Sequence, residues 1–227
     1  IFVEPIQGEG GYIVPPVQFI QGLRRICDQY GILLVMDEVQ SGMGRTGKMF
    51  ASEYFKVQPD IICLAKGIAS GMPLGAIIAP AKIMNWKYGS HASTFGGNPV
   101  SCAASNATID LLRGGLMANA RTTGRWIKKQ LKTFVDKYDI VGDVRGIGLM
   151  IGLEIVRDSK SKIPDTNLRS KVIEHCFRNG LLLLGCGAST IRICPSLVVN
   201  TEEAGQALEI LENAVEAVSA RKKRAVV

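Results

Sequence analysis

The sequence is poor in the residues and patterns from which metal sites, disulfide frameworks and membrane spans are built. It holds only two histidines, His91 and His175, so no metal centre is expected. Its six cysteines show no CxxC spacing and several lie in apolar runs, which predicts reduced core thiols. No apolar stretch reaches the ~18 residues of a transmembrane helix, so no membrane association is expected.

Aromatic residues are also missing where a nucleic-acid surface would need them. The formal net charge is +7, but four of the basic residues are clustered at 221–224. No aromatic side chain alternates with them, so a base-stacking surface is not indicated. Cations in the last turn of a helix complement its dipole, and we expect a solvated tail with no nucleic-acid partner.

Apolar residues make up 47% of the 227 residues, enough for the core of one large or two small domains. The chain starts at Ile1, inside a predicted strand, without an initiator methionine or a signal peptide. The composition predicts a soluble cytoplasmic enzyme.

Apolar periodicity predicts strands and helices in the alternation of an α/β fold. The predicted strands lie at about 1–4, 32–37, 60–65, 75–79, 141–145, 149–155, 181–184 and 190–194. The predicted helices lie at 17–30, from Pro99, from Leu116 to Tyr138, at 167–179 and from Thr201. Within 17–30 the apolar residues Phe19, Leu23, Ile26 and Tyr30 share one face. Gly114-Gly115 interrupts the pattern and marks the predicted boundary between domains 1–114 and 115–227.

Two ionisable residues stand at the carboxyl ends of predicted buried strands. Asp37 ends the run ILLVMD, and Lys66 follows the run DIICLA. Open α/β sheets bind ligands at this edge. A lysine that emerges there is expected to be desolvated, which suits it to Schiff-base chemistry. An aspartate can keep a pyridinium nitrogen protonated, as pyridoxal phosphate (PLP) requires. The pair therefore predicts a PLP site, with a solvated surface pair as the alternative.

Three Gly-rich polar loops favour the PLP site over the surface pair. They lie at 37–47, 65–76 and 91–99, so one follows Asp37 and another surrounds Lys66. Glycines allow the backbone to approach a ligand closely.

Five motifs occur in the order seen in class III aminotransferases, which the chain resembles along nearly its whole length. They are EPIQGEGG at 4–11, DEVQ at 37–40, AKG at 65–67, TFGGNP at 94–99 and IRICPS at 191–196. The resemblance implies an α/β protein of the PLP-dependent transferase fold type I. Residues 1–114 would belong to the large mixed-sheet cofactor domain, and residues 115–227 to the small C-terminal α+β domain. The motifs look most similar to those of 4-aminobutyrate and ornithine aminotransferases.

The resemblance also implies roles for single residues. Lys66 would hold PLP covalently and move a proton at the substrate carbon, while Asp37 would pair with the pyridinium nitrogen. Val39 would pack against the cofactor ring, and Gln40 would hydrogen-bond near its phenolic oxygen. Thr94 would reach the phosphate of the neighbouring subunit's cofactor. A homodimer is therefore the expected active unit, with a tetramer left open. A helix-capping hydroxyl is the alternative for Thr94.

Arg192 is predicted to bind a substrate carboxylate, because a guanidinium can clamp one with two parallel hydrogen bonds. The resemblance implies that it binds the α-carboxylate of glutamate and 2-oxoglutarate, and that Glu4 is its switch partner. Glu4 would neutralise Arg192 when the substrate's amine is on a terminal carbon. A structural ion pair is the alternative.

Proteins of the family are roughly twice as long, so we interpret the chain as the C-terminal half of a subunit. The phosphate-binding turn and a ring-stacking aromatic residue are expected from the other half. The expected reaction is PLP-dependent transfer of an amino group from an ω-amino acid, 4-aminobutyrate first, to 2-oxoglutarate. The alternatives are an ornithine or acetylornithine aminotransferase, an amino-acid racemase or epimerase of the same fold, and a non-catalytic chain used in assembly. Intact Asp37 and Lys66 argue against the last.

Overall fold

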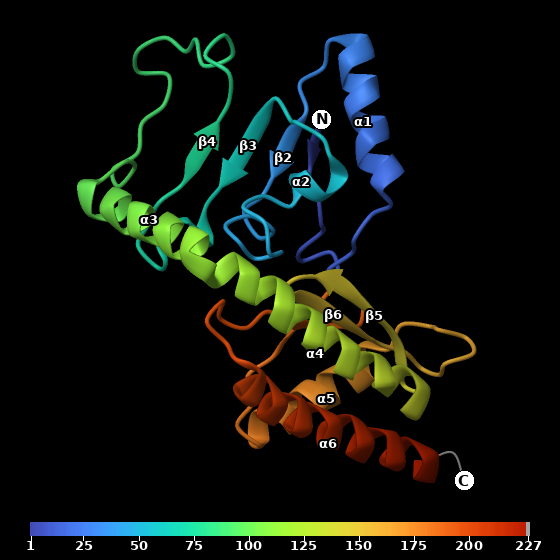
Figure 1. The fold of residues 1–227 in the computed structure, drawn as a ribbon. Helices are drawn as coiled ribbons and strands as arrows, with labels where there is room; N and C mark the ends of the chain where they lie inside the picture. The colour runs from blue at the N-terminus through green and yellow to red at the C-terminus, as the bar shows by residue number, and fades with distance from the viewer. Residues whose placement is uncertain (226–227) are drawn as a thin grey trace. The chain divides into compact units, whose positions relative to one another are not determined.

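A computed structural model describes residues 1–225, which form two compact units (Figure 1). Unit 1 comprises Ile1–Ile6 and Pro15–Met117, and unit 2 comprises Gln7–Val14 and the chain from Ala118 onward. The predicted first domain included residues 7–14. In the structure this short segment leaves unit 1 after the first strand and packs with unit 2 instead.

Unit 1 is built around a mixed sheet with strand order β1-β2-β3-β4. Its elements are β1 (Phe2–Val3), α1 (Val17–Tyr30), β2 (Val35–Asp37), α2 (Ser52–Phe55), β3 (Ile61–Leu64), a 3₁₀ helix (Lys66–Ala69), β4 (Ala76–Ile78) and α3 (Pro99–Leu111). The first three strands are parallel, and β4 is antiparallel to β3. The strands form in the apolar, β-branched runs, as expected of residues that fit a pleated buried surface. Because β2 and β3 are parallel neighbours, their carboxyl ends lie at the same edge.

Helix α1 turns an apolar face outward. Its most buried side chains are Ile20 and Cys27, and it ends at Gly31, whose φ of 65° lets its N–H donate to the Cys27 carbonyl. The side chains predicted to share an apolar face are largely exposed, with Phe19 at 51% and Tyr30 at 66%. The periodicity identified the helix correctly but not the side that faces the core of unit 1.

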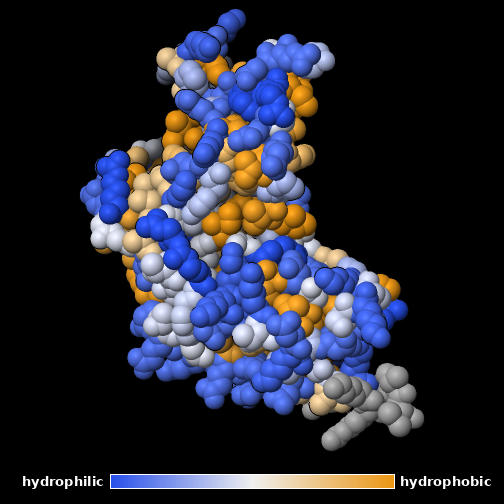
Figure 2. Space-filling model, turned by 45° about the vertical axis from the view of Figure 1, so that its right-hand side comes forward, coloured by the Kyte–Doolittle hydropathy of each residue, from blue (hydrophilic) through white to orange (hydrophobic). Residues whose placement is uncertain are grey.

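Unit 1 exposes further large apolar side chains on its sheet. They include Phe2, Ile77 and Ile78. Apolar surface of this kind is visible as orange patches on the face drawn in Figure 2. Exposed apolar patches are typical of regions that contact another protein surface.

Helix α3 runs into α4 (Met117–Lys137) through a π-helical turn at Leu112–Leu116. Gly115 in this turn has a φ of 149°, outside the helical region. The predicted interruption at Gly114-Gly115 is therefore a local kink between two helices rather than a loop.

Unit 2 holds an antiparallel sheet with strand order β5-β6-β8-β7. Its remaining elements are β5 (Val141–Ile147), β6 (Met150–Ile155), α5 (Thr166–Arg178), β7 (Leu184–Cys186), β8 (Thr190–Ile193) and α6 (Thr201–Ala225). The strand predicted at 181–184 was placed wrongly, since β7 begins only at Leu184. Four successive leucines at 181–184 show no alternation from which a strand boundary could be read.

One hydrophobic cluster joins α4, α5 and α6 to this sheet. Leu131, Ile151 and Val215 are fully buried in it. The α4 helix also approaches the turn between β5 and β6 very closely, because a Cβ added at Gly124 would lie 2.0 Å from the Gly148 carbonyl oxygen. Only glycine leaves room for that contact.

The cysteines differ in exposure. Cys27, Cys176 and Cys186 are buried, whereas Cys102 and Cys194 are exposed. None of the helices in the described part of the chain combines the length and the apolar character needed to cross a membrane. The side chains of 221 and 223–225 lie outside the described residues. They include three of the four basic residues at 221–224.

Candidate functional site

The predicted pair of Asp37 and Lys66 lies at one edge of the unit 1 sheet. Asp37 is the last residue of β2 and aligns with Cys63 of the neighbouring strand β3. Strand β3 ends at Leu64, and after the single residue Ala65, Lys66 opens the 3₁₀ helix. Parallel neighbouring strands thus deliver a carboxylate and an amine to the same carboxyl edge, where open α/β sheets bind ligands.

Asp37 is partly buried and accepts a hydrogen bond from the Val39 N–H at 2.9 Å. Burial, together with the negative charge of Asp37, raises the pKa of the Cys63 thiol. The carboxylate is therefore held at the strand end by the backbone of the loop that follows it.

Lys66 differs from expectation in one respect. Its side chain is exposed, so the predicted desolvation is not present in the structure. Its backbone has a φ of 47°, in the left-handed region that non-glycine residues seldom adopt. The β3 strand stops short of Lys66, and the lysine lies on the turn beyond it.

The Gly-rich loop after β2 is anchored by Glu38, which is only 1% exposed. Its carboxylate accepts hydrogen bonds from the Ser41 hydroxyl at 2.6 Å, from Ala51 N–H at 3.0 Å and from Ser52 N–H at 2.7 Å. A Cβ at Gly42 would lie 2.7 Å from the Glu38 carbonyl oxygen, so this turn needs a glycine.

Sequence reasoning missed the anchoring role of Glu38. The signal was an acidic residue directly after the strand tip, next to the predicted ligands. The anchored turn holds Val39 and Gln40 in a partly buried position beside Asp37. Their predicted contacts with a cofactor ring stay predictions.

The loop before α3 is exposed, and Thr94 lies within it. The cap of α3 is Asn98, whose side chain accepts the Ser101 N–H at 2.9 Å, and Pro99 occupies the first helical position. Thr94 is therefore not the helix cap, which removes the alternative considered for it. Its predicted contact with a partner subunit stays a prediction.

Arg192 lies on β8 of unit 2, between the buried Ile191 and Ile193. Its side chain is 22% exposed and forms an ion pair with Glu9. The sequence interpretation assigned this partnership to Glu4, in the same motif, and overlooked Glu9. Glu4 belongs to unit 1, and its predicted role is untested.

The position of Glu9 follows from a tight turn in residues 7–14. The N–H groups of Gly11 and Tyr12 both donate to the Gly8 carbonyl, at 3.1 and 3.2 Å. The Gln7 N–H donates to the Ile13 carbonyl at 3.0 Å and closes the base of the turn. The sequence signal for a partner of Arg192 was Glu9 itself, the second acidic residue of the motif, which lies between Gly8 and Gly10.

Comparison with known proteins agrees with this architecture. The family model for aminotransferase class III matches residues 1–215, and the chain belongs to that family. Its fold is the PLP-dependent transferase fold type I, as predicted. The chain spans about half the length of the curated relatives it matches.

Three relatives illustrate the range of the family. An alanine/serine racemase from Pyrococcus horikoshii is 46% identical over 218 residues, which are 95% of this chain and 46% of the racemase. An acetylornithine aminotransferase from Brucella melitensis is 42% identical over 222 residues, 96% of this chain and 53% of that protein. The solved structure of taurine:2-oxoglutarate aminotransferase from Bifidobacterium kashiwanohense, in complex with PLP and glutamate, matches with a TM-score of 0.91 and 31% identity, covering 97% of this chain and 52% of that one.

Proposed function

We propose that the full-length protein is a PLP-dependent enzyme that acts at the amino group of amino acids. The observation that carries this proposal is the placement of Asp37 and Lys66 at the carboxyl edge of adjacent parallel strands. A carboxylate and an exposed amine at one sheet edge fit the pyridinium nitrogen and the aldehyde of PLP. Membership of the class III family supports the same cofactor.

When bound, PLP supplies an electron sink for the carbon that carries the substrate's amino group. Asp37 would accept the N–H of the pyridinium ring and keep that nitrogen protonated. Lys66 would hold the cofactor through its amine, and would then take and return the proton at the substrate carbon. Val39 and Gln40 would orient the ring.

Arg192 would bind the substrate carboxylate with two parallel hydrogen bonds. In the structure the Glu9 carboxylate forms an ion pair with the Arg192 guanidinium. A carboxylate that binds Arg192 through Nη1 would displace Glu9, whereas substrates that lack a carboxylate at that position would leave the pair closed. This arrangement suits an enzyme that alternates between an ω-amino acid and 2-oxoglutarate.

The first candidate reaction is therefore amino transfer from an ω-amino acid to 2-oxoglutarate. The 42% identity with an acetylornithine aminotransferase supports acetylornithine or ornithine as the donor better than 4-aminobutyrate, which was the first expectation from sequence. The active unit would be a homodimer in which Thr94 reaches the partner's cofactor phosphate.

The second candidate is an amino-acid racemase, which the 46% identity with an alanine/serine racemase favours. Removal of the proton at Cα and its return on the opposite face would use the same Lys66 and Asp37. Such an enzyme needs no keto acid.

The two candidates are separated by supplying one substrate at a time to the full-length protein. A transaminase is expected to form glutamate from acetylornithine, ornithine or 4-aminobutyrate only when 2-oxoglutarate is present. A racemase is expected to interconvert the enantiomers of alanine, serine or a branched amino acid without any keto acid. Absence of both activities in PLP-loaded protein would contradict the proposal and favour the assembly role.

A further inference from the structure

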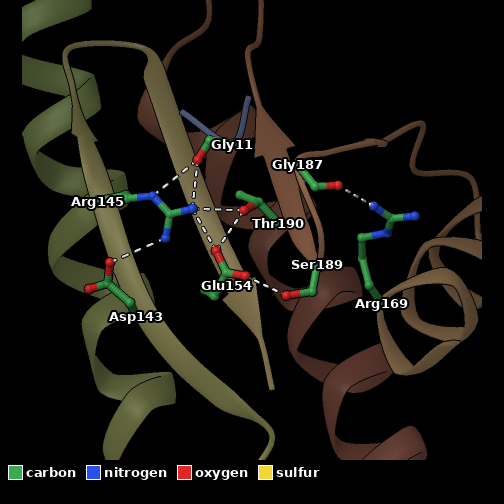
Figure 3. A network of polar contacts seen from close by, with 8 residues as sticks. All are labelled: Gly11, Asp143, Arg145, Glu154, Arg169, Gly187, Ser189 and Thr190. Atoms are coloured by element: carbon green, nitrogen blue, oxygen red, sulfur yellow. Dashed lines mark hydrogen bonds and ion pairs between the residues drawn. The ribbon is translucent and has the colours of Figure 1, made fainter. Parts of the chain in front are cut away.

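Residues 7–14 are attached to unit 2 by contacts that converge on the Gly11 carbonyl (Figure 3). Arg145 on β5 donates to this oxygen twice, from Nε at 3.0 Å and from Nη2 at 2.6 Å. Two charge-assisted hydrogen bonds to one carbonyl are a strong attachment for a short turn.

Arg145 is itself held by its neighbours in the sheet. Its Nη2 also donates to Glu154 at 2.5 Å and to the Thr190 hydroxyl at 2.7 Å, and its Nη1 lies 3.3 Å from Asp143. The guanidinium is therefore oriented by groups on β5, β6 and β8. All three of these groups lie outside residues 7–14.

Glu154 is held on the same side of the sheet. Its two carboxylate oxygens accept the hydroxyls of Ser189 and Thr190 as well as the Arg145 guanidinium. Burial alone would raise the pKa of Glu154, but these hydrogen bonds outweigh burial and lower it. The carboxylate therefore stays charged and keeps Arg145 in place near neutral pH.

The turn is seated closely on the sheet beside these groups. The Gly187 N–H donates to the Glu9 carbonyl at 2.7 Å. A Cβ at Gly187 would lie 2.8 Å from the Gly10 carbonyl oxygen and 3.0 Å from the Gly11 Cα. The hydrogen bonds to the Glu9 carbonyl and to the Gly11 carbonyl thus fix the backbone position of Glu9.

The side chain of Glu9 is 66% exposed, although it pairs with Arg192. An exposed ion pair gains little free energy by itself, because water solvates both charges well. The position of the turn that carries Glu9 therefore contributes to the contact between Glu9 and Arg192.

We propose that Arg145 is a positioning residue for carboxylate recognition: by holding the Gly11 carbonyl, it keeps Glu9 on Arg192 and sets how readily a substrate carboxylate displaces Glu9. The inference rests on the proposed role of Arg192. Loss of the hydrogen bonds from Arg145 to the Gly11 carbonyl lets Glu9 move into solvent, so Arg192 becomes more available to ligands.

The test uses full-length, PLP-loaded protein and glutarate, a dicarboxylate with no amine or keto group to react. Calorimetry measures its dissociation constant in Arg145→Met, Glu9→Gln and the double variant. Arg145→Met is expected to bind glutarate about 3- to 10-fold more tightly, from the loss of an interaction of ~1 kcal/mol. Glu9→Gln is expected to do the same.

The double variant decides whether Arg145 acts through Glu9. If it does, Arg145→Met adds nothing in the Glu9→Gln background, because residues that act through one contact are non-additive. Equal effects of Arg145→Met in both backgrounds, or weaker binding in Arg145→Met, would overturn the inference. The control is Arg178→Met, which removes an exposed ion pair with Glu174 on α5 and should leave glutarate binding unchanged.

Hydrogen exchange distinguishes a failure of the positioning role of Arg145 from a failure of the proposed role of Arg192. The amides of Gly11 and Tyr12 should exchange faster in Arg145→Met, and also in Arg145→Lys, which keeps the charge but cannot donate twice to one carbonyl. Unchanged exchange in both variants would contradict the positioning role. If exchange rises but Arg192→Ala binds glutarate as well as wild type does, it is the proposed role of Arg192 that fails.

Discussion

At the scale of single residues, the charge of Asp37 is the feature on which the proposed chemistry depends most. The carboxylate accepts the Val39 N–H. An asparagine can accept the same hydrogen bond through its side-chain oxygen. Asp37→Asn therefore removes the charge while preserving the local backbone, and separates electronic from structural effects.

Asp37→Asn in the full-length protein is expected to bind PLP and to lose at least ~10-fold in turnover, since a charge-assisted hydrogen bond contributes about 1.5–3 kcal/mol. Steady-state kinetics with PLP in excess measure the loss. Turnover close to that of wild type would show that the reaction does not need the charge of Asp37.

Glu154 gives a prediction about pH. Its pKa is lowered in the folded state, so its contribution to stability is complete above the unfolded value of about 4.3 and is lost as pH falls through the lowered folded value. The free energy of unfolding of wild type should therefore fall below about pH 5. Glu154→Gln should be less stable at pH 7 and show a shallower decline on acidification.

Urea denaturation at a series of pH values measures both effects. Glu209→Gln, at an exposed position on α6, is the control and should follow the wild-type curve. Parallel curves for wild type and Glu154→Gln would show that Glu154 is not charged and bonded in the folded state as described.

At the scale of elements, the junction of α3 and α4 depends on the backbone of one glycine. Gly115 has a φ of 149°, which an L side chain rarely adopts, whereas a Cβ at Gly114 or Gly115 would meet nothing within 4 Å. The two neighbours therefore differ in backbone conformation and not in the space around them.

Gly115→Ala is expected to lower the free energy of unfolding by about 1–3 kcal/mol through backbone strain. Gly114→Ala is the matched control and should be neutral, or stabilising by up to ~1 kcal/mol, as alanine in a helix generally is. Chemical denaturation of the two variants provides the comparison. Equal stability would mean that the kink tolerates a side chain.

The elements also show what could be predicted from the sequence. Strands β2 and β3 were found because their apolar, β-branched runs end in a polar residue, and this placed Asp37 and Lys66 at one edge. The strand near 181–184 was misplaced because its leucines do not alternate. The outward face of α1 was not predictable, because a period of 3.6 gives the apolar side but not what covers it.

The Arg192 site was only half predictable for a different reason. Motif resemblance identified Arg192, but the residue that meets it lies 183 positions away in the chain. The choice between Glu4 and Glu9 depends on the tight turn at 8–11 and on its attachment by Arg145. The attachment joins residues 134 positions apart, and local sequence patterns do not encode such a contact.

At the scale of the whole molecule, the chain corresponds to about half of its curated relatives, and unit 1 exposes apolar side chains on α1 and on its sheet. Residues 1–227 expressed alone are expected to bind PLP at least ~10-fold more weakly than the full-length protein, because the resemblance implies that phosphate and ring-stacking contacts come from the other half. Fluorescence titration with PLP measures the two affinities. Equal affinities would show that residues 1–227 hold the whole cofactor site.

One measurement tests directly whether Lys66 is the lysine that binds the cofactor covalently. Full-length protein is loaded with PLP, treated with borohydride to make the lysine–cofactor bond irreversible, digested and mapped by mass spectrometry. The pyridoxyl group is expected on Lys66, and none on the matching peptide of Lys66→Ala. A pyridoxyl group on another lysine, with Lys66 unmodified, would contradict it.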